Sequence, residues 1–188
     1  MSNEVVLDIE TQDAASGDNR SLRISVVGCY FFENNEYLCY EEHELPQLFR
    51  RLEHSGRIIG YNTKSFDYPI MNNYYAGDVA SFTSLDILEE IHKTLGFRVK
   101  LDDVAKATLG VGKSGHGLQA VEWWKQGEIQ KIKDYCLQDV KITKEVYEFG
   151  KLYHIVRYLD RLGTYHDIPV NFGGVPKQDT TINLTMGF

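Results

Sequence analysis

Short apolar and β-branched runs in the first part of the chain predict a group of strands. Residues 5–7 form one such run, which ends at Asp8. Residues 22–32 alternate in part between apolar and polar positions, and residues 37–40 form a further run. The Asn-Asn pair at 34–35 between them is typical of a hairpin turn. The pattern therefore predicts three consecutive strands joined by tight turns.

After these strands, segments with helical periodicity alternate with short strand-like runs along the chain. Residues 45–52 place leucine and phenylalanine side chains on one face of a helix. Residues 58–61 and 82–85 are short runs typical of buried strands, and a helix is predicted between them from Tyr68 onward. The rest of the chain, to about Tyr158, is predicted to be mostly helical. The order β-β-β-α-β-α-β followed by helices predicts an α/β fold, with helices on the faces of a mixed sheet.

A single folded domain is the expectation at this length. The chain has 188 residues, of which 43% are hydrophobic, and this is enough to bury one core. We assign this domain to residues 1–170. Residues 171–188 are polar and contain glycine. They are interpreted as a C-terminal tail, or as an ordering segment of unknown role.

Composition favours a soluble cytoplasmic protein with no membrane partner. No apolar run reaches about 18 residues, and the first residues lack the basic start and apolar stretch of a secretory signal. The three cysteines have no CxxC spacing. They are interpreted as reduced core residues and not as a disulfide framework or a zinc site.

The formal net charge of −7 limits the ways in which this chain could bind nucleic acid. A protein that grips nucleic acid with its whole surface is usually basic, so the charge counts against a tight, non-specific DNA binder. If nucleic acid is the partner, binding must be local, transient and assisted by metal cations.

Two carboxylates follow the first strand. Asp8 and Glu10 are two positions apart, so on a strand their side chains point to the same face. They are interpreted either as a metal site or as a solvated acidic strand end. Thr11 follows them, and it could hydrogen-bond the local backbone or contact a ligand.

A second polar segment, residues 62–67, lies between a predicted strand and a predicted helix. Asp67 is either a metal ligand or a plain helix N-cap. Asn62 could be a binding residue or only a turn residue. Lys64 could touch a phosphate or stay solvated, and Phe66 could stack on a base or pack in the core.

A third segment places polar groups on a core-facing helix stripe. Tyr135 and Asp139 are four residues apart and share one helix face. An apolar arc runs along this helix, and Asp139 falls near its middle. The arc consists of Ile129, Ile132, Cys136, Val140, Val146 and Phe149. A buried carboxylate is costly unless it is paired with a lysine or binds a metal ion, and both interpretations stay open here.

These three segments together resemble the motifs of the DEDD, or DnaQ-like, exonucleases of the ribonuclease H-like superfamily. The matching residues are DIET at 8–11, NTKSFD at 62–67 and YCLQD at 135–139. The tyrosine of the third motif resembles the DEDDy branch, which includes the proofreading domains of family B DNA polymerases. Residues 101–113 also look like the predicted exonucleases related to those domains. In all, the resemblance covers roughly residues 4–159.

The resemblance implies a five-stranded mixed sheet flanked by helices, with its first three strands antiparallel. It implies two divalent cations, Mg²⁺ or Mn²⁺, held by Asp8, Glu10, Asp67 and Asp139, with Tyr135 hydrogen-bonded to the attacking water. The implied activity is 3′→5′ hydrolysis at the free 3′ end of nucleic acid, with single-stranded DNA favoured over RNA. A 3′→5′ exoribonuclease and a non-catalytic nucleic-acid-binding module are the alternatives, and protein partners acting in trans stay open.

Elementary chemistry supports the same roles. Converging carboxylates repel one another and raise one another's pKa values, and divalent cations remove that repulsion. All-oxygen ligands suit hard ions such as Mg²⁺ or Mn²⁺. A tyrosine with a usual pKa of about 10 suits an orienting hydrogen bond better than strong base catalysis.

Five residues are candidates for contacts to nucleic acid: Thr11, Asn62, Lys64, Phe66 and Lys113. Lys113 lies in a glycine-rich stretch, residues 110–117, which could approach a nucleic-acid backbone or serve as a flexible connector. The stretch is not a phosphate-binding P-loop, because its spacing is wrong and no strand precedes it.

Overall fold

The computed structural model describes residues 3–14, 18–112 and 117–173. Its strands are β1 (Glu4–Thr11), β2 (Ile24–Phe31), β3 (Glu36–Glu41), β4 (Arg57–Gly60), β5 (Ser84–Asp86), β6 (Ile155–Leu159) and β7 (Tyr165–Pro169). Its helices are α1 (Leu45–Glu53), α2 (Asp67–Met71), α3 (Ile87–Leu95), α4 (Leu101–Leu109), α5 (Gly117–Gln126) and α6 (Ile129–Tyr153). Short 3-10 helices lie at Asn19–Ser21, Glu42–Glu44 and Val79–Ser81.

A five-stranded mixed sheet with the strand order β3-β2-β1-β4-β5 forms the centre of the fold. β1 pairs antiparallel with β2, and β2 pairs antiparallel with β3. β4 pairs parallel with β1, and β5 pairs parallel with β4. The predicted α/β class, with three antiparallel strands followed by strands that helices separate, is therefore confirmed.

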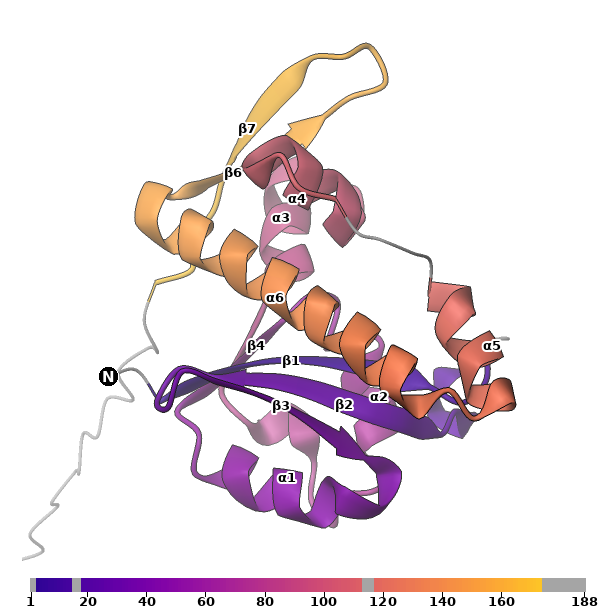
Figure 1. Ribbon diagram of the computed structural model, residues 1–188. Coiled ribbons are helices and arrows are strands. Elements are labelled where there is room, and N and C mark those ends of the chain that lie inside the picture. The colour runs from indigo at the N-terminus through magenta and orange to yellow at the C-terminus, as the bar shows by residue number, and fades with distance from the viewer. Residues whose placement is uncertain (1–2, 15–17, 113–116, 174–188) are drawn as a thin grey trace, which may run out of the picture.

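Alternation along β1 divides the core into two layers. Val5 and Leu7 pack with residues of α1 and α2, whereas Val6 packs with residues of α3, α4 and α6. Figure 1 shows α6 crossing one face of the sheet and α1 lying on the opposite face. Because side chains two apart on a strand share a face, Asp8 and Glu10 follow Val6 toward the α6 side.

The middle of the predicted stripe on α6 is buried against the sheet, whereas Ile129 and Phe149 are half-buried. Ile132, Cys136, Val140 and Val146 are each fully buried, and Asp139 is only 3% exposed. The lysines of this helix lie outside the stripe, and Lys133 and Lys144 pair instead with Glu41 and Glu148. Helical periodicity therefore placed the carboxylate correctly inside the core-facing surface.

The prediction that the chain is helical to about Tyr158 is wrong at its end. α6 stops at Tyr153, and His154 takes a left-handed conformation with φ of 59°. β6 then pairs antiparallel with β7, and the hairpin projects from the body of the molecule (Figure 1). The apolar residues of β6 continue the helical pattern in sequence, but Val156 is buried by packing with residues distant in the chain, which local periodicity does not encode.

The chain continues past β7 into a buried contact with the sheet and α6. Phe172 is fully buried, and its ring stacks on that of Tyr147 with 6.1 Å between centroids. Arg57, at the start of β4, pairs with Glu4 and donates a hydrogen bond of 2.6 Å to the Gly173 carbonyl. Of the segment interpreted as a tail, residues 174–188 lie outside the described part of the chain.

Two of the three cysteines belong to the core. Cys29 and Cys136 are fully buried, and Cys39 is half-buried beside Cys136. None of the helices within residues 3–14, 18–112 and 117–173 is long and apolar enough to cross a membrane.

Candidate metal centre

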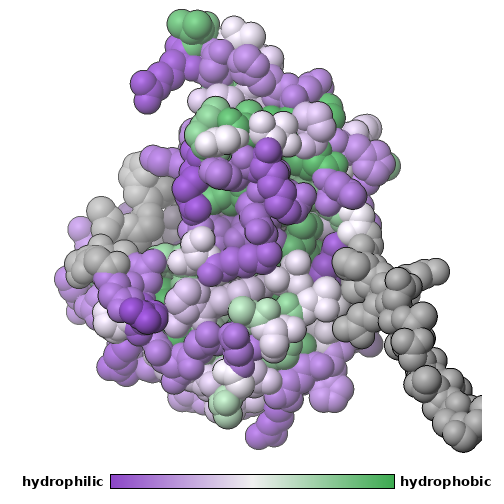
Figure 2. Space-filling model, turned by 180° about the vertical axis from the view of Figure 1, so that it is seen from behind, coloured by the Kyte–Doolittle hydropathy of each residue, from purple (hydrophilic) through white to green (hydrophobic). Residues whose placement is uncertain are grey.

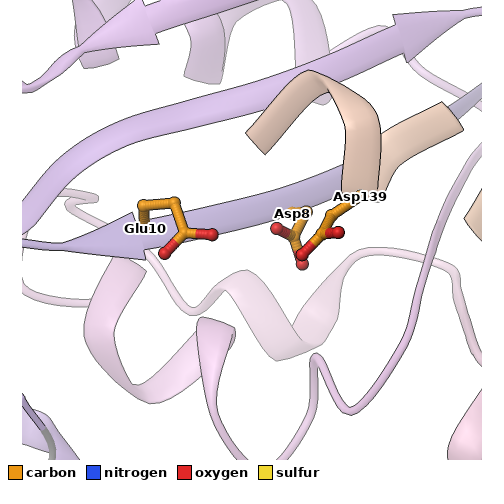
Figure 3. A group of neighbouring side chains, drawn as sticks. All are labelled: Asp8, Glu10 and Asp139. Carbon is orange, nitrogen blue, oxygen red and sulfur yellow. The ribbon is translucent and has the colours of Figure 1, made fainter. Parts of the chain in front are cut away.

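Three carboxylates from two elements converge where β1 meets α6. Asp8 and Glu10 come from β1 and Asp139 comes from α6. One oxygen atom from each lies within 4.8 Å of the corresponding atom of the other two. Figure 3 shows the Asp8 and Asp139 side chains next to each other, with Glu10 further along the strand. The structure thus brings together three of the four predicted metal ligands, from segments that are about 130 positions apart.

A glycine on the neighbouring strand allows α6 to approach this closely. A Cβ atom at Gly28, on β2, would lie 2.8 Å from the Cys136 Sγ atom and 3.1 Å from the Val140 Cγ2 atom. The Cys136 thiol donates to the Asp8 carbonyl oxygen at 3.4 Å. Asp139 is one turn beyond Cys136, so the close packing of this turn fixes its carboxylate beside that of Asp8.

Asp67, the fourth predicted ligand, occupies the first position of α2 and is not one of the three carboxylates that converge, although the charge of Asp8 acts on it. Phe66 occupies the N-cap position, so the interpretation of Asp67 as a plain N-cap is wrong. Its carboxyl is 2% exposed, and its Oδ1 atom has no hydrogen-bond partner among the described residues. Burial, followed by the charges of Asp8 and Asp86, raises the pKa of this carboxyl well above its usual range.

Tyr135 faces the same carboxylates from one turn earlier on α6. Its side chain is 6% exposed, and its ring contacts Trp123 of α5 edge-on, with 6.1 Å between centroids. Burial raises the pKa of its phenol, and the charges of Asp139, Glu10 and Asp8 raise it further. The phenol therefore stays protonated and can donate a hydrogen bond.

The residues present fit hard divalent cations. The donor atoms that converge are carboxylate oxygens, which suit Mg²⁺ or Mn²⁺ better than soft metals. Two ionised carboxylates about 5 Å apart repel by about 3 kcal/mol at an effective dielectric constant near 20. The buried Oδ1 atom of Asp67, which lacks a partner among the described residues, offers a further ligand. A cation would relieve both the repulsion and the unsatisfied buried oxygen.

Asp86 organises the segment that carries Asp67. Its carboxylate accepts hydrogen bonds from the backbone N–H groups of Asn62 at 2.8 Å and Lys64 at 3.1 Å. It also caps α3 by accepting from the Leu88 N–H at 3.0 Å. A strand-ending aspartate before a helix predicts the cap, but nothing in the sequence indicates the bond to the earlier segment. Asp86 thus holds the left-handed turn at Asn62, whose φ is 68°.

The candidate nucleic-acid contacts have different local roles. The Thr11 hydroxyl donates to the Asp13 carbonyl at 2.7 Å, and Lys64 pairs with Glu89 at 2.5 Å. Phe66 is half-buried against the core. Asn62 accepts a hydrogen bond from Arg98, a residue that sequence reasoning missed and for which no local signal exists.

Lys113 and residues 114–116 of the glycine-rich stretch lie outside the described residues. The predicted approach of this stretch to nucleic acid therefore stays a prediction.

Comparison with known proteins identifies a matching family and a similar solved structure. A family model described as the RNase H superfamily matches residues 5–150. A comparison with curated proteins found no match. Among solved structures, the chain is similar to the family B DNA polymerase of the hyperthermophilic archaeon Pyrobaculum calidifontis, with a TM-score of 0.62 and 17% identity. The match covers 78% of this chain but 24% of the polymerase chain, so this chain spans about a quarter of that protein's length.

Proposed function

This chain belongs to the RNase H superfamily, and from that premise we propose that it is a metal-dependent 3′→5′ exonuclease acting on single-stranded DNA. RNase H-like nucleases use divalent metals, and the acidic cluster of Asp8, Glu10 and Asp139 is the candidate site for them in this chain. The proposal adds the polarity of digestion, the substrate and the individual roles of the residues.

One observation carries the proposal: two strand carboxylates and one buried helix carboxylate converge within 4.8 Å. The three negative charges repel one another at this distance, so the grouping costs free energy in the absence of a cation. Phosphate groups would also be repelled by it. Both problems disappear when the carboxylates serve as ligands for cations, and cations at a phosphate are the requirement of phosphodiester hydrolysis.

In this proposal the carboxylates and Tyr135 have different roles. Asp8, Glu10, Asp67 and Asp139 hold the divalent ions, which supply positive charge to the phosphate and acidify water when bound. Tyr135 donates or accepts a hydrogen bond that orients the attacking water, and its raised pKa keeps the phenol neutral. The water gives up a proton as its oxygen bonds to phosphorus, and the bond from phosphorus to the 3′ oxygen of the shortened strand breaks. That oxygen takes up a proton and becomes the new 3′ hydroxyl, and a nucleoside 5′-monophosphate leaves.

DNA is the favoured substrate because the similar solved structure is a DNA polymerase. Single strands are favoured because an unpaired 3′ end can reach the carboxylates without first being separated from a complementary strand. The net charge of −7 agrees with an enzyme that binds nucleic acid locally through metal ions and not over its whole surface.

The test is digestion of 5′-labelled single-stranded DNA and a matched RNA, each with Mg²⁺, Mn²⁺ or EDTA. The wild-type protein is compared with Asp139→Asn and with Asp134→Asn, which changes an exposed aspartate on the same helix. We expect a ladder that shortens from the 3′ end with metal, disappears with EDTA and with Asp139→Asn, and persists with Asp134→Asn.

Each other outcome has a defined meaning. Stronger digestion of RNA would make the protein an exoribonuclease with the same chemistry. Equal activity in the wild type and Asp139→Asn would refute the assignment of the metal centre. Binding without digestion under every metal condition would favour the non-catalytic binding module.

A further inference from the structure

A second concave surface lies between the β6–β7 hairpin and the connection from α3 to α4. Its volume is about 690 Å³, and its walls include Phe97 and Lys100 on one side and Tyr158, Arg161 and His166 on the other. Figure 2 shows the projecting segment at the top of the molecule overhanging a hollow. We name this surface the hairpin cleft.

The hairpin cleft has a continuous aromatic wall. Phe97 contacts Tyr158 edge-on with 5.7 Å between centroids, and Tyr158 stacks on His166 at 6.4 Å with 26° between the ring planes. Phe97 is 47% exposed, which is unusual for a side chain of this size. The exposed ring of Phe97, with the stacked Tyr158 and His166 pair beside it, forms a stacking platform for flat ligands.

Charges around the platform favour an anionic ligand. Arg98, Lys100 and Arg161 line the cleft, and the opposing carboxylates are Asp103 and Asp160. The Asp160 carboxylate already has hydrogen-bond partners within the hairpin. Its Oδ2 atom lies 2.8 Å from the His166 Nε2 atom, and its Oδ1 atom accepts from the N–H groups of Leu162 and Thr164. This local excess of cations contrasts with the net charge of −7 of the whole chain.

Arg98 connects the hairpin cleft with the segment that carries Asp67. It lines the cleft and also a smaller recess of about 150 Å³, which is bordered by Asn62, Lys64 and Asp86. Its guanidinium donates a hydrogen bond to the Asn62 side chain. The two concave surfaces therefore meet at Arg98, and its partner Asn62 lies five residues before Asp67 in the chain.

We propose that the hairpin cleft binds the single-stranded nucleic acid several nucleotides upstream of the 3′ end, with bases stacked on Phe97 and Tyr158 and phosphates near Arg98, Lys100 and Arg161. The inference rests on the proposed function, which places the 3′ end at the carboxylates. Stacking on aromatic side chains tolerates any base, and basic groups beside the rings follow the backbone. The occupant is a single strand because paired bases do not expose the faces that these rings would contact.

The test measures binding in EDTA, so that no hydrolysis is needed. The probes are fluorescent oligothymidylates of about 4 and about 16 nucleotides, which bracket the usual length of such sites. The protein is the full chain as wild type, Phe97→Ala, Arg161→Glu and the control Leu152→Ala, which removes an apolar side chain that is 68% exposed on α6. Thermal unfolding checks that each variant is folded.

We expect Phe97→Ala and Arg161→Glu each to lower the ratio of long- to short-oligonucleotide affinity by about tenfold. Leu152→Ala should leave the ratio at the wild-type value. Raised salt should weaken binding of the long probe less in Arg161→Glu than in the wild type, because a phosphate contact has been removed.

The same ratio in all four proteins would overturn the inference and would leave the hairpin cleft to a protein partner. An absence of digestion with metal, combined with a ratio that depends on Phe97, would count against the exonuclease and not against the cleft. The two proposals therefore fail by different measurements.

Discussion

The Asp86 carboxylate accepts a hydrogen bond of 2.8 Å from the backbone N–H of Asn62, and this bond joins the end of β5 to the turn after β4. Asp86 ends β5 and Asn62 follows β4, and the carboxyl ends of these two neighbouring parallel strands meet at one edge of the sheet. Asp86 is 3% exposed and serves four backbone N–H groups, two in the turn and two in α3. One side chain therefore fixes both the helix start and the path of the chain toward Asp67.

Replacement of Asp86 by alanine should destabilise the protein strongly. The substitution removes the cap of α3 and leaves the N–H groups of Asn62 and Lys64 without their acceptor, so we expect a loss of about 2–4 kcal/mol in the free energy of unfolding. Urea denaturation measures this loss. Asp78→Ala is the control, because Asp78 caps only a three-residue 3-10 helix in an exposed loop, and its loss should be below about 1 kcal/mol.

Local pattern was sufficient to predict the parts of the site that lie on regular elements. Strand alternation placed Asp8 and Glu10 on one face, and helical periodicity placed Asp139 inside the buried stripe of α6. The resemblance then related these segments to one another. Local pattern could place each side chain on its face, because strand and helix geometry are local properties of the sequence. The convergence of three of these carboxylates within 4.8 Å depends on how distant segments pack, which local pattern does not encode.

Features that depend on distant contacts were not predicted. Arg98 reaches Asn62 across 36 residues, and no periodicity marks that pair. The β6–β7 hairpin follows a helix of 25 residues, and the apolar residues of β6 extend the same pattern. What selects a strand there is the left-handed residue His154 and pairing with β7, neither of which leaves a periodic signal.

The raised pKa of Asp67 predicts how stability without metal depends on pH. In the unfolded chain this carboxyl titrates near its usual value of about 3.9, whereas in the folded protein burial and the charges of Asp8 and Asp86 raise the pKa. Between those two pKa values the folded state binds more protons, so the free energy of unfolding falls as pH rises. Urea denaturation in EDTA at a series of pH values measures this fall.

Asp67→Asn should reduce that dependence. The amide is close to the carboxyl in shape and carries no charge. The variant should therefore be more stable than the wild type in EDTA at the upper end of the pH range between the two pKa values. Mn²⁺ should stabilise the wild type more than Asp67→Asn, because the variant lacks one ligand. Asp134→Asn, on the exposed side of α6, should follow the wild type in both measurements. If the free energy of unfolding depends on pH in the same way in wild type and Asp67→Asn, the pKa of Asp67 is not raised by folding.

Tyr135→Phe should lower kcat and leave the fold intact. The phenol faces the three carboxylates, and loss of its hydrogen bond to the attacking water should cost about 10²-fold in kcat. Since the pKa of the phenol is raised, Tyr135 does not lose its proton in the usual working range. The shape of the pH–rate profile should therefore be the same in wild type and variant, and only its height should change.

Tyr153→Phe provides the control, because Tyr153 lies on the same helix and is 58% exposed. Its kcat should match that of the wild type. A rise of the rate with pH that is seen in the wild type and is absent only in Tyr135→Phe would instead make Tyr135 a titrating base.

Gly28→Ala should disturb the metal centre without touching a carboxylate. The added methyl group would lie 2.8 Å from the Cys136 Sγ atom and 3.1 Å from the Val140 Cγ2 atom, and because both side chains are buried we expect α6 to move away from the sheet. Overpacking of this kind costs about 1–3 kcal/mol in the free energy of unfolding. Because Asp139 is one turn beyond Cys136, the same movement should separate its carboxylate from that of Asp8 and weaken Mn²⁺ binding.

Cys136→Ala tests whether the clash is the cause. It removes the atom nearest to the new methyl group, so the double variant should be less destabilised than the sum of the two single variants. Val140 stays close to residue 28, so recovery should be partial. Urea denaturation of the four proteins gives the coupling energy, and calorimetric titration with Mn²⁺ gives the affinity for metal. Strictly additive losses would show that α6 accommodates the methyl group elsewhere, and the packing of Cys136 on Gly28 would then not be what positions Asp139.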